Sequence, residues 1–207
     1  MERRKLRTRT ALIEAAQEIY AERGDFDVSI QQITEAADVG FGTFYNHFPS
    51  KSELLDAAIA QALEAHAAWL EELLADVDDA AVVFATSMRL TVRLVRTRPR
   101  LAKVMMNSRG ALLTAPFGHA VHARRDLEAA EAAGRFVIEN VDVALACTAG
   151  CLIATMHVCA DAAPDAVDAL ADQAVRSVLR MFGMPEAEVV RIVALPLPSV
   201  EPSAEPA

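Results

Sequence analysis

Apolar residues recur at intervals of three and four positions along most of the chain, which is the period of an α-helix. The first such stripe runs from about residue 8 to residue 23 and ends at Gly24, a residue type that commonly stops helices. The alternation with a period of two that marks a half-buried strand is never sustained. The pattern therefore predicts an all-α fold.

The same period continues between interruptions by proline, glycine and aspartate, and each interruption marks a helix end. The expected helices are two short ones within 29–48, a long one from Ser50 to about Ala75, one over 80–98 ended by Pro99, and others near 100–110, 119–133, 137–161 and 165–182. After Val193 the chain is rich in proline and has no core-forming pattern, which predicts disorder.

The segment from Ser29 to Glu53 carries the most specific local signals. Ser29 with Gln32, and Ser50 with Glu53, fit the capping box, in which two side chains satisfy backbone donors at a helix start. Between these two starts the sequence D-V-G at 38–40 interrupts the apolar period. Two short helices joined by a tight turn form a helix-turn-helix, whose second helix enters the DNA major groove. DNA binding is therefore the leading interpretation.

The net charge of −9 is unusual for a nucleic-acid-binding protein, but the charge is unevenly distributed. Residues 1–10 carry five basic side chains against one acidic side chain, a local charge of +4. Residues 1–51 hold seven basic and eight acidic residues, whereas residues 52–207 hold 13 basic and 21 acidic residues. The acidic load thus lies outside the candidate helix-turn-helix, which favours nucleic acid at the N-terminal end.

The string G-T-F-Y-x-H-F at 42–48, followed by S-K-x-E-L at 50–54, resembles the TetR family of bacterial transcriptional regulators. A basic lead-in and the pattern S-x-x-x-I-x-x-A-A from Ser29 extend the resemblance over about residues 6–56. The resemblance implies a three-helix DNA-binding head, a helical body with an internal ligand pocket, and a homodimer formed largely by the last two helices. Ligand binding in the body is then expected to release the operator.

This resemblance sets the expected domain boundaries. Residues 1–53 form the DNA-binding domain with a basic arm over 1–9, residues 54–183 form the regulatory and dimerisation domain, and residues 184–207 form a largely disordered tail. The residues expected to contact DNA are Arg3, Arg4, Lys5, Arg7, Arg9, Ser29, Gly40, Phe41, Thr43, Tyr45, His47 and Lys51. For Tyr45 and His47 the alternative is packing within the head, where Phe44 and Phe48 are expected to be core residues.

The motif departs from the family pattern at three positions. Asp38 stands where the turn usually has glycine, and aspartate tolerates a left-handed backbone. Gly40 replaces a serine that would cap the next helix more strongly. Phe41 replaces a residue that is often polar, and it can either touch a thymine methyl group or fold back onto the head. With Gly40 and Gly42 beside it, the base-reading surface is sparse in side chains.

Outside the motif, four groups of residues have both a functional and a plain structural interpretation. Candidates to line a ligand pocket, or simply the core, are Trp69, Phe84, Met88, Met105, Met106, Phe117 and Met156. Cys147, Thr148, Cys151 and Thr155 are expected at a close helix contact at the dimer interface, with a redox or metal sensor as the alternative. His119 and His122 are either metal ligands or surface or pocket histidines. Arg89, Arg93 and Arg96 form either a solvated face or an anion site.

The expected function is a ligand-responsive DNA-binding regulator, most often a repressor, released by a small and largely apolar molecule. The expected partners are double-stranded operator DNA, a second copy of the chain and this effector. No cofactor, metal or catalytic residue is expected, and an enzyme or a small-molecule sequestering protein without DNA function are the alternatives. Three cysteines, no signal-peptide pattern and no run of 18 apolar residues predict a cytoplasmic protein that does not span a membrane.

Overall fold

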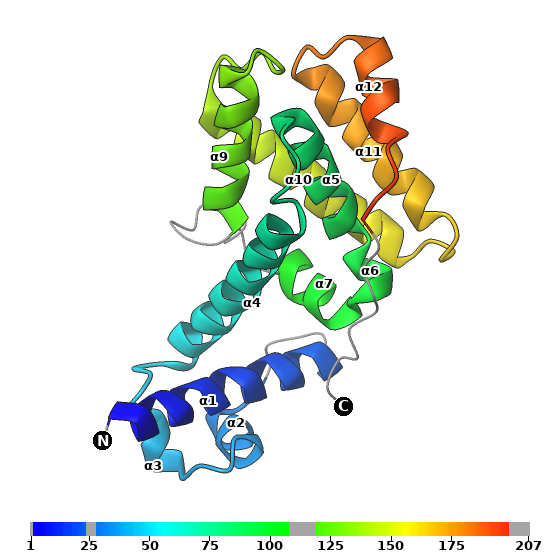
Figure 1. Cartoon of the computed structure of the whole chain (residues 1–207). Helices are drawn as coiled ribbons and strands as arrows, with labels where there is room; N and C mark the ends of the chain where they lie inside the picture. Colours follow the sequence, from blue (N-terminus) through cyan, green and yellow to red (C-terminus); the bar gives the residue numbers. More distant parts are fainter. Residues whose placement is uncertain (1, 24–27, 108–118, 199–207) are drawn as a thin grey trace.

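The computed structural model describes residues 2–23, 28–107 and 119–198, and every regular element in these ranges is a helix. The helices of the N-terminal head are α1 (Glu2–Arg23), α2 (Ile30–Ala36) and α3 (Phe41–Phe44). The remaining helices are α4 (Lys51–Leu73), α5 (Ala80–Val92), α6 (Leu94–Thr97), α7 (Pro99–Met106), α9 (His119–Ala132), α10 (Val141–Ala160), α11 (Val167–Met181) and α12 (Glu186–Val193). Figure 1 shows the head at one end, the body at the other, and α4 running between them.

The helix-turn-helix forms as the sequence predicts. The Ser29 hydroxyl accepts a hydrogen bond from the Gln32 amide at 3.2 Å, and the Gln32 side-chain oxygen accepts one from the Ser29 amide at 2.9 Å, which completes the capping box. Asp38 has a φ of 51°, so this residue does adopt the left-handed backbone of the turn. Gly40 starts α3 without a side-chain cap, also as expected.

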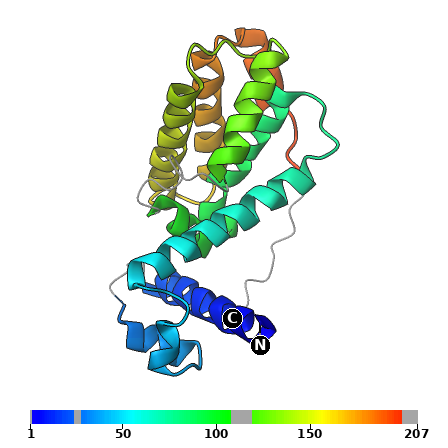
Figure 2. The same cartoon turned by 90° about the vertical axis from the view of Figure 1, so that its left-hand side faces the viewer.

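Helix α4 belongs to two hydrophobic cores at once. Near its start, Leu54 and Ala58 pack in the head with α1, α2 and the buried Phe44. Farther along, Leu63 and the neighbouring body residues pack in the second core. Figure 2 shows α4 as one continuous helix that passes from the head to the far side of the body. The two cores therefore share a rigid element.

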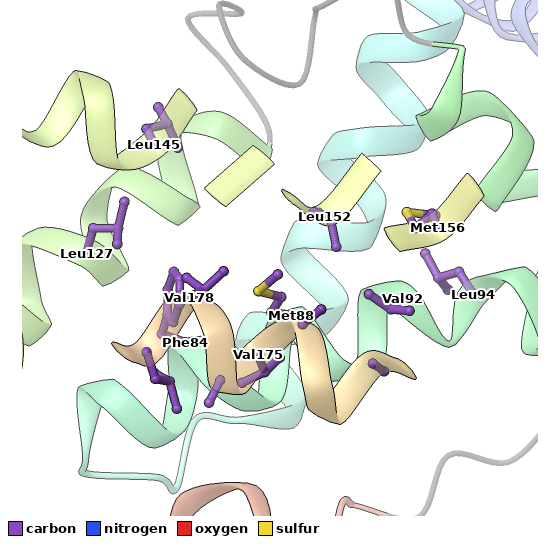
Figure 3. Packing of buried hydrophobic residues seen from close by; sticks show 14 of the residues in the cluster. Phe84, Met88, Val92, Leu94, Leu127, Leu145, Leu152, Met156, Val175 and Val178 are labelled. Atoms are coloured by element: carbon purple, nitrogen blue, oxygen red, sulfur yellow. The ribbon is translucent and has the colours of Figure 1, made fainter. Parts of the chain in front are cut away.

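Helix α5 is the centre of the body, where it packs against α9, α10 and α11. Figure 3 shows side chains of α5, α10 and α11 directed toward one another, among them Met88, Leu152 and Val175. Three aromatic rings, Phe84, Phe136 and Phe182, meet at centroid distances of 5.0–5.9 Å at one end of this core. Apolar burial of this kind is the main favourable contribution to folding.

The prediction of a single helix over 80–98 is wrong, because this segment is divided into α5 and α6 at Arg93. Arg93 has helical angles, but its amide bonds to both Arg89 and Thr91 carbonyls as a helix cap. Pro99 does not simply end a helix, since it occupies the first turn of α7. Proline lacks an amide hydrogen and has a fixed φ, so it is well suited to that position.

Two further boundaries differ from the sequence prediction. Helix α1 begins at Glu2, so the basic residues lie on its first turns and do not form a separate arm. The segment 186–193, assigned to a disordered tail, is helix α12, whose Val189 and Ile192 are buried against the body. A short amphipathic helix of this kind is stabilised by tertiary burial, which its own eight residues do not reveal. Residues 199–207 lie outside the described ranges.

Truncation of a core side chain tests this packing. Leu127 on α9 is fully buried, whereas Val121 on the same helix is 46% exposed. Leu127→Ala is expected to lower the free energy of unfolding by about 2–5 kcal/mol, because it leaves a cavity in addition to removing apolar contacts. Val121→Ala is expected to change it by less than about 0.5 kcal/mol. Equal effects of the two variants in urea unfolding would contradict the packing of α9.

Candidate DNA-binding surface and effector pocket

One concave surface of the head combines the start of α1 with the helix-turn-helix. Its volume is about 680 Å³, and it is open to solvent. It is lined by Arg4, Lys5 and Thr8 of α1 and by Asp38, Val39, Gly40, Thr43, Asn46 and His47 of the turn and its surroundings. Basic side chains at the edge of the second helix are the arrangement in which phosphate contacts position a helix on a duplex.

Phe41 and Tyr45 project from this end of the head. Phe41 is 52% exposed and Tyr45 is 53% exposed, and their rings are 5.9 Å apart. Phe41 therefore does not fold back into the head core, and Tyr45 is not a core residue. By contrast, Phe44 and Phe48 are buried, as predicted. The exposed pair is available for contact with sugar, phosphate or a thymine methyl group.

His47 lies in a positively charged environment. Burial, together with the charges of Lys5 and Arg9, holds the pKa of His47 below its usual value. Its Nδ1 atom is buried and has no hydrogen-bond partner within the described residues. Arg9 lies with its guanidinium carbon 4.9 Å from the centre of the Phe48 ring, so it contributes positive charge while it also packs on the head.

Two of the other expected DNA contacts have structural partners. The Lys51 ammonium donates to the Val28 carbonyl oxygen at 3.0 Å, which ties the start of α4 to the segment before α2. Ser29 is exposed, but its hydroxyl is engaged in the capping box. Arg3, Arg4, Lys5 and Arg7 are all exposed on the first turns of α1.

A second site is a small, partly open pocket within the body, between α4, α5, α9 and α10. Its volume is about 60 Å³. Its apolar walls are formed by Ala67, Leu70, Val83, Phe84, Met88, Ala123 and Leu152, and its polar groups come from Glu71, Ser87, His122, Arg125, Asp126 and Thr148. Mostly apolar walls with a few convergent polar groups are typical of small-molecule sites.

The polar groups of this pocket are only partly satisfied. The Thr148 hydroxyl oxygen and His122 Nδ1 are both buried without a hydrogen-bond partner within the described residues. Arg125 donates to Glu71 at 2.6 Å, and His122 Nδ1 lies 3.6 Å from the other Glu71 carboxylate oxygen. Buried unsatisfied polar atoms are uncommon and point to a missing partner, such as a ligand or an ordered water.

Asp126 is the least solvated carboxylate of the pocket, with 16% of its side chain exposed. Burial raises the pKa of Asp126, although Arg125 and His122 act in the opposite direction. Its ionised form is therefore disfavoured in the folded protein, and a hydrogen-bond donor brought into the pocket would stabilise that form.

Comparisons with known proteins identify the family of the chain. Residues 12–58 match the sequence model of the bacterial regulatory proteins of the tetR family, and residues 79–194 match that of the tetracyclin repressor-like C-terminal domain. The chain belongs to the TetR family. The transcriptional regulator UidR of Escherichia coli is 41% identical over 54 residues, which span 26% of this chain and 28% of that relative.

The likeness to solved structures covers almost the whole chain. RolR without ligand is 35% identical, with a TM-score of 0.77, over 93% of this chain and 100% of that one. RolR in complex with the ligand resorcinol is 34% identical, with a TM-score of 0.72, over 97% and 100% of the two chains. The transcriptional regulator FadR of Bacillus subtilis, in complex with stearoyl-CoA, shares the fold with a TM-score of 0.64 at 19% identity, over 82% of this chain and 97% of that one.

The residues predicted to line a pocket do not all lie in the same site. Phe84 and Met88 line the pocket described above. Met105 and Met156 are fully buried core residues that do not line it, and Met106 packs at the edge of the core. Trp69 lines a different cleft, beside α6. Phe117 lies outside the described residues.

The residues of α10 that were expected at the dimer interface differ in their exposure to solvent. Cys147 is exposed, and Cys151 and Thr155 are half-buried. Assignment of Thr148 to the interface is wrong, because its side chain is buried and lines the pocket with Leu152. Neighbouring residues on a helix point about 100° apart, so Thr148 and Cys147 face different surroundings.

The histidine pair and the cysteines form no metal site among the described residues, where no group of three or more His, Cys, Asp or Glu side chains could hold a metal ion. His122 lies in the pocket, and the side chain of His119 is outside the described residues. Burial raises the pKa of Cys159, which disfavours its reactive thiolate.

Glu71, Arg125 and Asp126 line the pocket but were not predicted from the sequence as site residues. His122, Arg125 and Asp126 have the spacing i, i+3, i+4, which places three ionisable side chains on one face of α9. That spacing was the available signal, but a solvent-facing stripe of a helix has the same pattern. Only the packing of α9 on α4 and α5 brings this face to the edge of the pocket.

The low exposure of the Asp126 carboxylate makes the stability of the protein depend on pH. Because the folded-state pKa is raised, ionised Asp126 opposes folding at neutral pH, and this cost decreases as the pH falls toward the raised pKa and the carboxylate becomes protonated. Asp126→Asn is therefore expected to have a higher Tm than the wild type at pH 7. The difference should shrink as the pH is lowered.

The matched control for this comparison is Asp76→Asn, which changes an exposed carboxylate in the loop after α4. It is expected to change the Tm little across the same pH series. Thermal melts from pH 7 to about pH 4 check both variants. A lower Tm for Asp126→Asn at pH 7 would mean that the Arg125 pair outweighs the burial of Asp126.

Proposed function

We propose that this chain is a homodimeric transcriptional repressor that binds operator DNA through its head and is released by a small hydroxylated aromatic molecule bound in the body. The concave surface of the head is the main support for DNA binding. It is lined by Arg4, Lys5, Thr43 and His47, and the exposed Tyr45 lies beside it. Phosphate-binding side chains next to a helix-turn-helix fit the duplex backbone on both sides of one major groove. The proposed head comprises residues 1–53, and the proposed body extends from residue 54 to 193.

A homodimer is proposed because α10 has an exposed apolar side. Val143 is 59% exposed and Val158 is 57% exposed, and Met181 of the neighbouring α11 is 48% exposed. Among the described residues, α10 is also the one helix long and apolar enough to cross a membrane by length and composition. In a protein of this family, a second copy that covers α10 and α11 would bury this surface, and two-fold symmetry would place two heads on one operator.

The proposed effector class follows from the chemistry of the pocket. Apolar walls suit an aromatic ring, while the Thr148 oxygen and His122 nitrogen without partners among the described residues, and the largely buried Asp126, suit hydroxyl groups on that ring. A phenolic hydroxyl can donate to the Asp126 carboxylate and accept from Thr148 or His122. Resorcinol, which RolR binds, has this chemistry and provides a first compound to test.

The pocket must expand to accept such a ligand. Its volume of about 60 Å³ is well below the roughly 150 Å³ of a cavity that takes up benzene. The groups that can move are Glu71 on α4 and Arg125 and His122 on α9, which contact one another across the pocket. A ligand that separates Glu71 from Arg125 would shift α4 relative to α9. Because α4 continues into the head, the shift would displace the head from its position on the DNA.

Binding to a DNA fragment from upstream of the chain's own gene tests the first half of the proposal. We expect specific binding that weakens as salt is raised, because counterions are released from the phosphates. Tyr45→Ala is expected to weaken binding about tenfold, and Arg4→Gln is expected to weaken it and reduce the salt slope by about one for each protomer. Arg191→Gln on α12, in the body, is the matched control and should bind like the wild type.

Circular dichroism of each variant shows whether the helical fold is kept. A wild-type protein that binds none of the upstream fragments at low salt would instead support a sequestering protein without DNA function. Binding that Tyr45→Ala and Arg4→Gln leave unchanged would show that the DNA lies on another surface.

Titration with resorcinol tests the effector class. We expect resorcinol to raise the Tm and to lower the affinity for DNA. Thr148→Val is expected to weaken resorcinol binding about fivefold, because one hydrogen bond of about 1 kcal/mol is removed without a change in shape. Thr155→Val, on the same helix but outside the pocket, is the matched control. Calorimetry that finds the two variants equal would exclude Thr148 as a ligand contact.

A further inference from the structure

A second cleft lies between the end of α5, α6 and α4, and it shares no lining residue with the effector pocket. Its volume is about 330 Å³, within the range of small-molecule sites. Trp69, Leu90 and Leu94 contribute apolar surface, and four arginines, Arg89, Arg93, Arg96 and Arg98, contribute positive charge. The helical register separates the two sites, because Met88 faces the effector pocket and Arg89 faces the cleft.

The charge of the cleft is not balanced by its own carboxylates. Among the described residues that line it, Asp168 is the one acidic side chain, and its Oδ1 atom lies 2.7 Å from Arg93 Nε and 3.1 Å from Arg96 Nη2. Asp172, just outside the lining, lies 2.8 Å from Arg89 Nε. The guanidinium groups of Arg89, Arg93 and Arg96 thus share two carboxylates, in a chain whose net charge is −9.

Arg93 carries a buried donor atom that its ion pairs do not use. Its side chain is 11% exposed, and its Nη1 atom is buried with no hydrogen-bond partner within the described residues. Burial alone would raise the pKa of Asp168, yet the hydrogen bond from Arg93 and the charges of Arg93 and Arg96 hold that pKa below its usual value. The cleft therefore has a positive potential and a buried donor that lacks an acceptor.

We propose that this cleft is a second ligand site, which binds a small carboxylate with an apolar or aromatic body. The carboxylate would accept hydrogen bonds from Arg93 and Arg96, whose planar guanidinium groups suit a two-oxygen acceptor. The apolar body would lie against Leu90, Leu94 and the edge of Trp69. Binding at this site does not require the proposed DNA-binding function, and only its effect on operator release rests on that function.

The position of the cleft suits regulation. It lies against α6, which leads directly into α7, and α7 packs on α1 of the head. The Tyr20 hydroxyl of α1 donates to the Lys103 carbonyl oxygen of α7 at 3.1 Å. A ligand that rearranges Arg93 and Arg96 would thus act on the head through α6 and α7, by a route separate from α4.

Trp69 is the one tryptophan of the chain, so its fluorescence reports on the cleft directly. The test titrates the full chain with benzoate at low salt, in the absence of DNA, and compares it with benzamide, a neutral molecule of nearly the same shape. We expect a saturable change in fluorescence with benzoate and at least tenfold weaker binding of benzamide. No saturable benzoate binding, or equal binding of benzamide, overturns the proposal.

Two substitutions with opposite expected effects distinguish a ligand site from a structural ion-pair network. Arg96→Gln removes a partly exposed guanidinium and is expected to weaken benzoate binding about tenfold. Asp168→Asn removes the competing carboxylate and is expected to strengthen binding several-fold. A merely structural role of these pairs predicts no gain from Asp168→Asn, so weaker or unchanged binding in that variant overturns the proposal.

Two control variants show whether benzoate binds in the cleft or elsewhere on the protein. Thr148→Val changes the effector pocket and Arg180→Gln changes an exposed arginine at the far end of α11, and both should bind benzoate like the wild type. Loss of benzoate binding in Thr148→Val but not in Arg96→Gln would assign the ligand to the effector pocket and overturn the proposal. Failure to bind upstream DNA would leave these binding results intact and would remove only the proposed effect on the operator.

Discussion

The membership of α4 in two hydrophobic cores is the constraint on which the rest of the molecule depends. Leu54 and Ala58 hold the first turns in the head, and Ile59 and Leu63 hold the following turns in the body. The helix has 23 residues and therefore a length of about 35 Å. A packed helix of this length moves as a unit, so a displacement at the proposed effector pocket would reach the head without any new contact between the two domains.

The second general feature is the presence of incompletely satisfied polar groups inside an otherwise apolar body. Thr148 and His122 in the effector pocket, and Arg93 in the arginine-lined cleft, each bury an atom without a partner within the described residues. Such groups reduce stability in the ligand-free protein, and a ligand bound at the proposed sites would offset that cost by supplying the missing partner. The raised pKa of Asp126 has the same physical basis. The features that we propose for ligand binding at both sites are therefore the ones that reduce stability.

The agreement between sequence and structure is best in the head, for a local reason. The capping box at Ser29 and the left-handed turn at Asp38 depend on residues at most four positions apart, so their geometry is determined by nearby side chains and backbone sterics. The burial of Phe44 and Phe48 follows from helical spacing. The errors lie where distant segments decide the outcome. The break at Arg93, helix α12, and the inward position of Thr148 all depend on packing against other helices.

The sequence by itself determined the all-α class, the helix-turn-helix and the family, because helical periodicity, caps and a dense motif are encoded in neighbouring residues. It also placed the basic charge at the start of the chain. Only the tertiary structure decided which polar residues meet one another. His122, Arg125 and Asp126 meet Glu71 across the effector pocket, and Arg93 and Arg96 meet Asp168 beside the cleft, over separations of more than 50 residues. Such contacts depend on how whole helices rotate about their axes to bury their apolar sides, and no local pattern specifies that rotation.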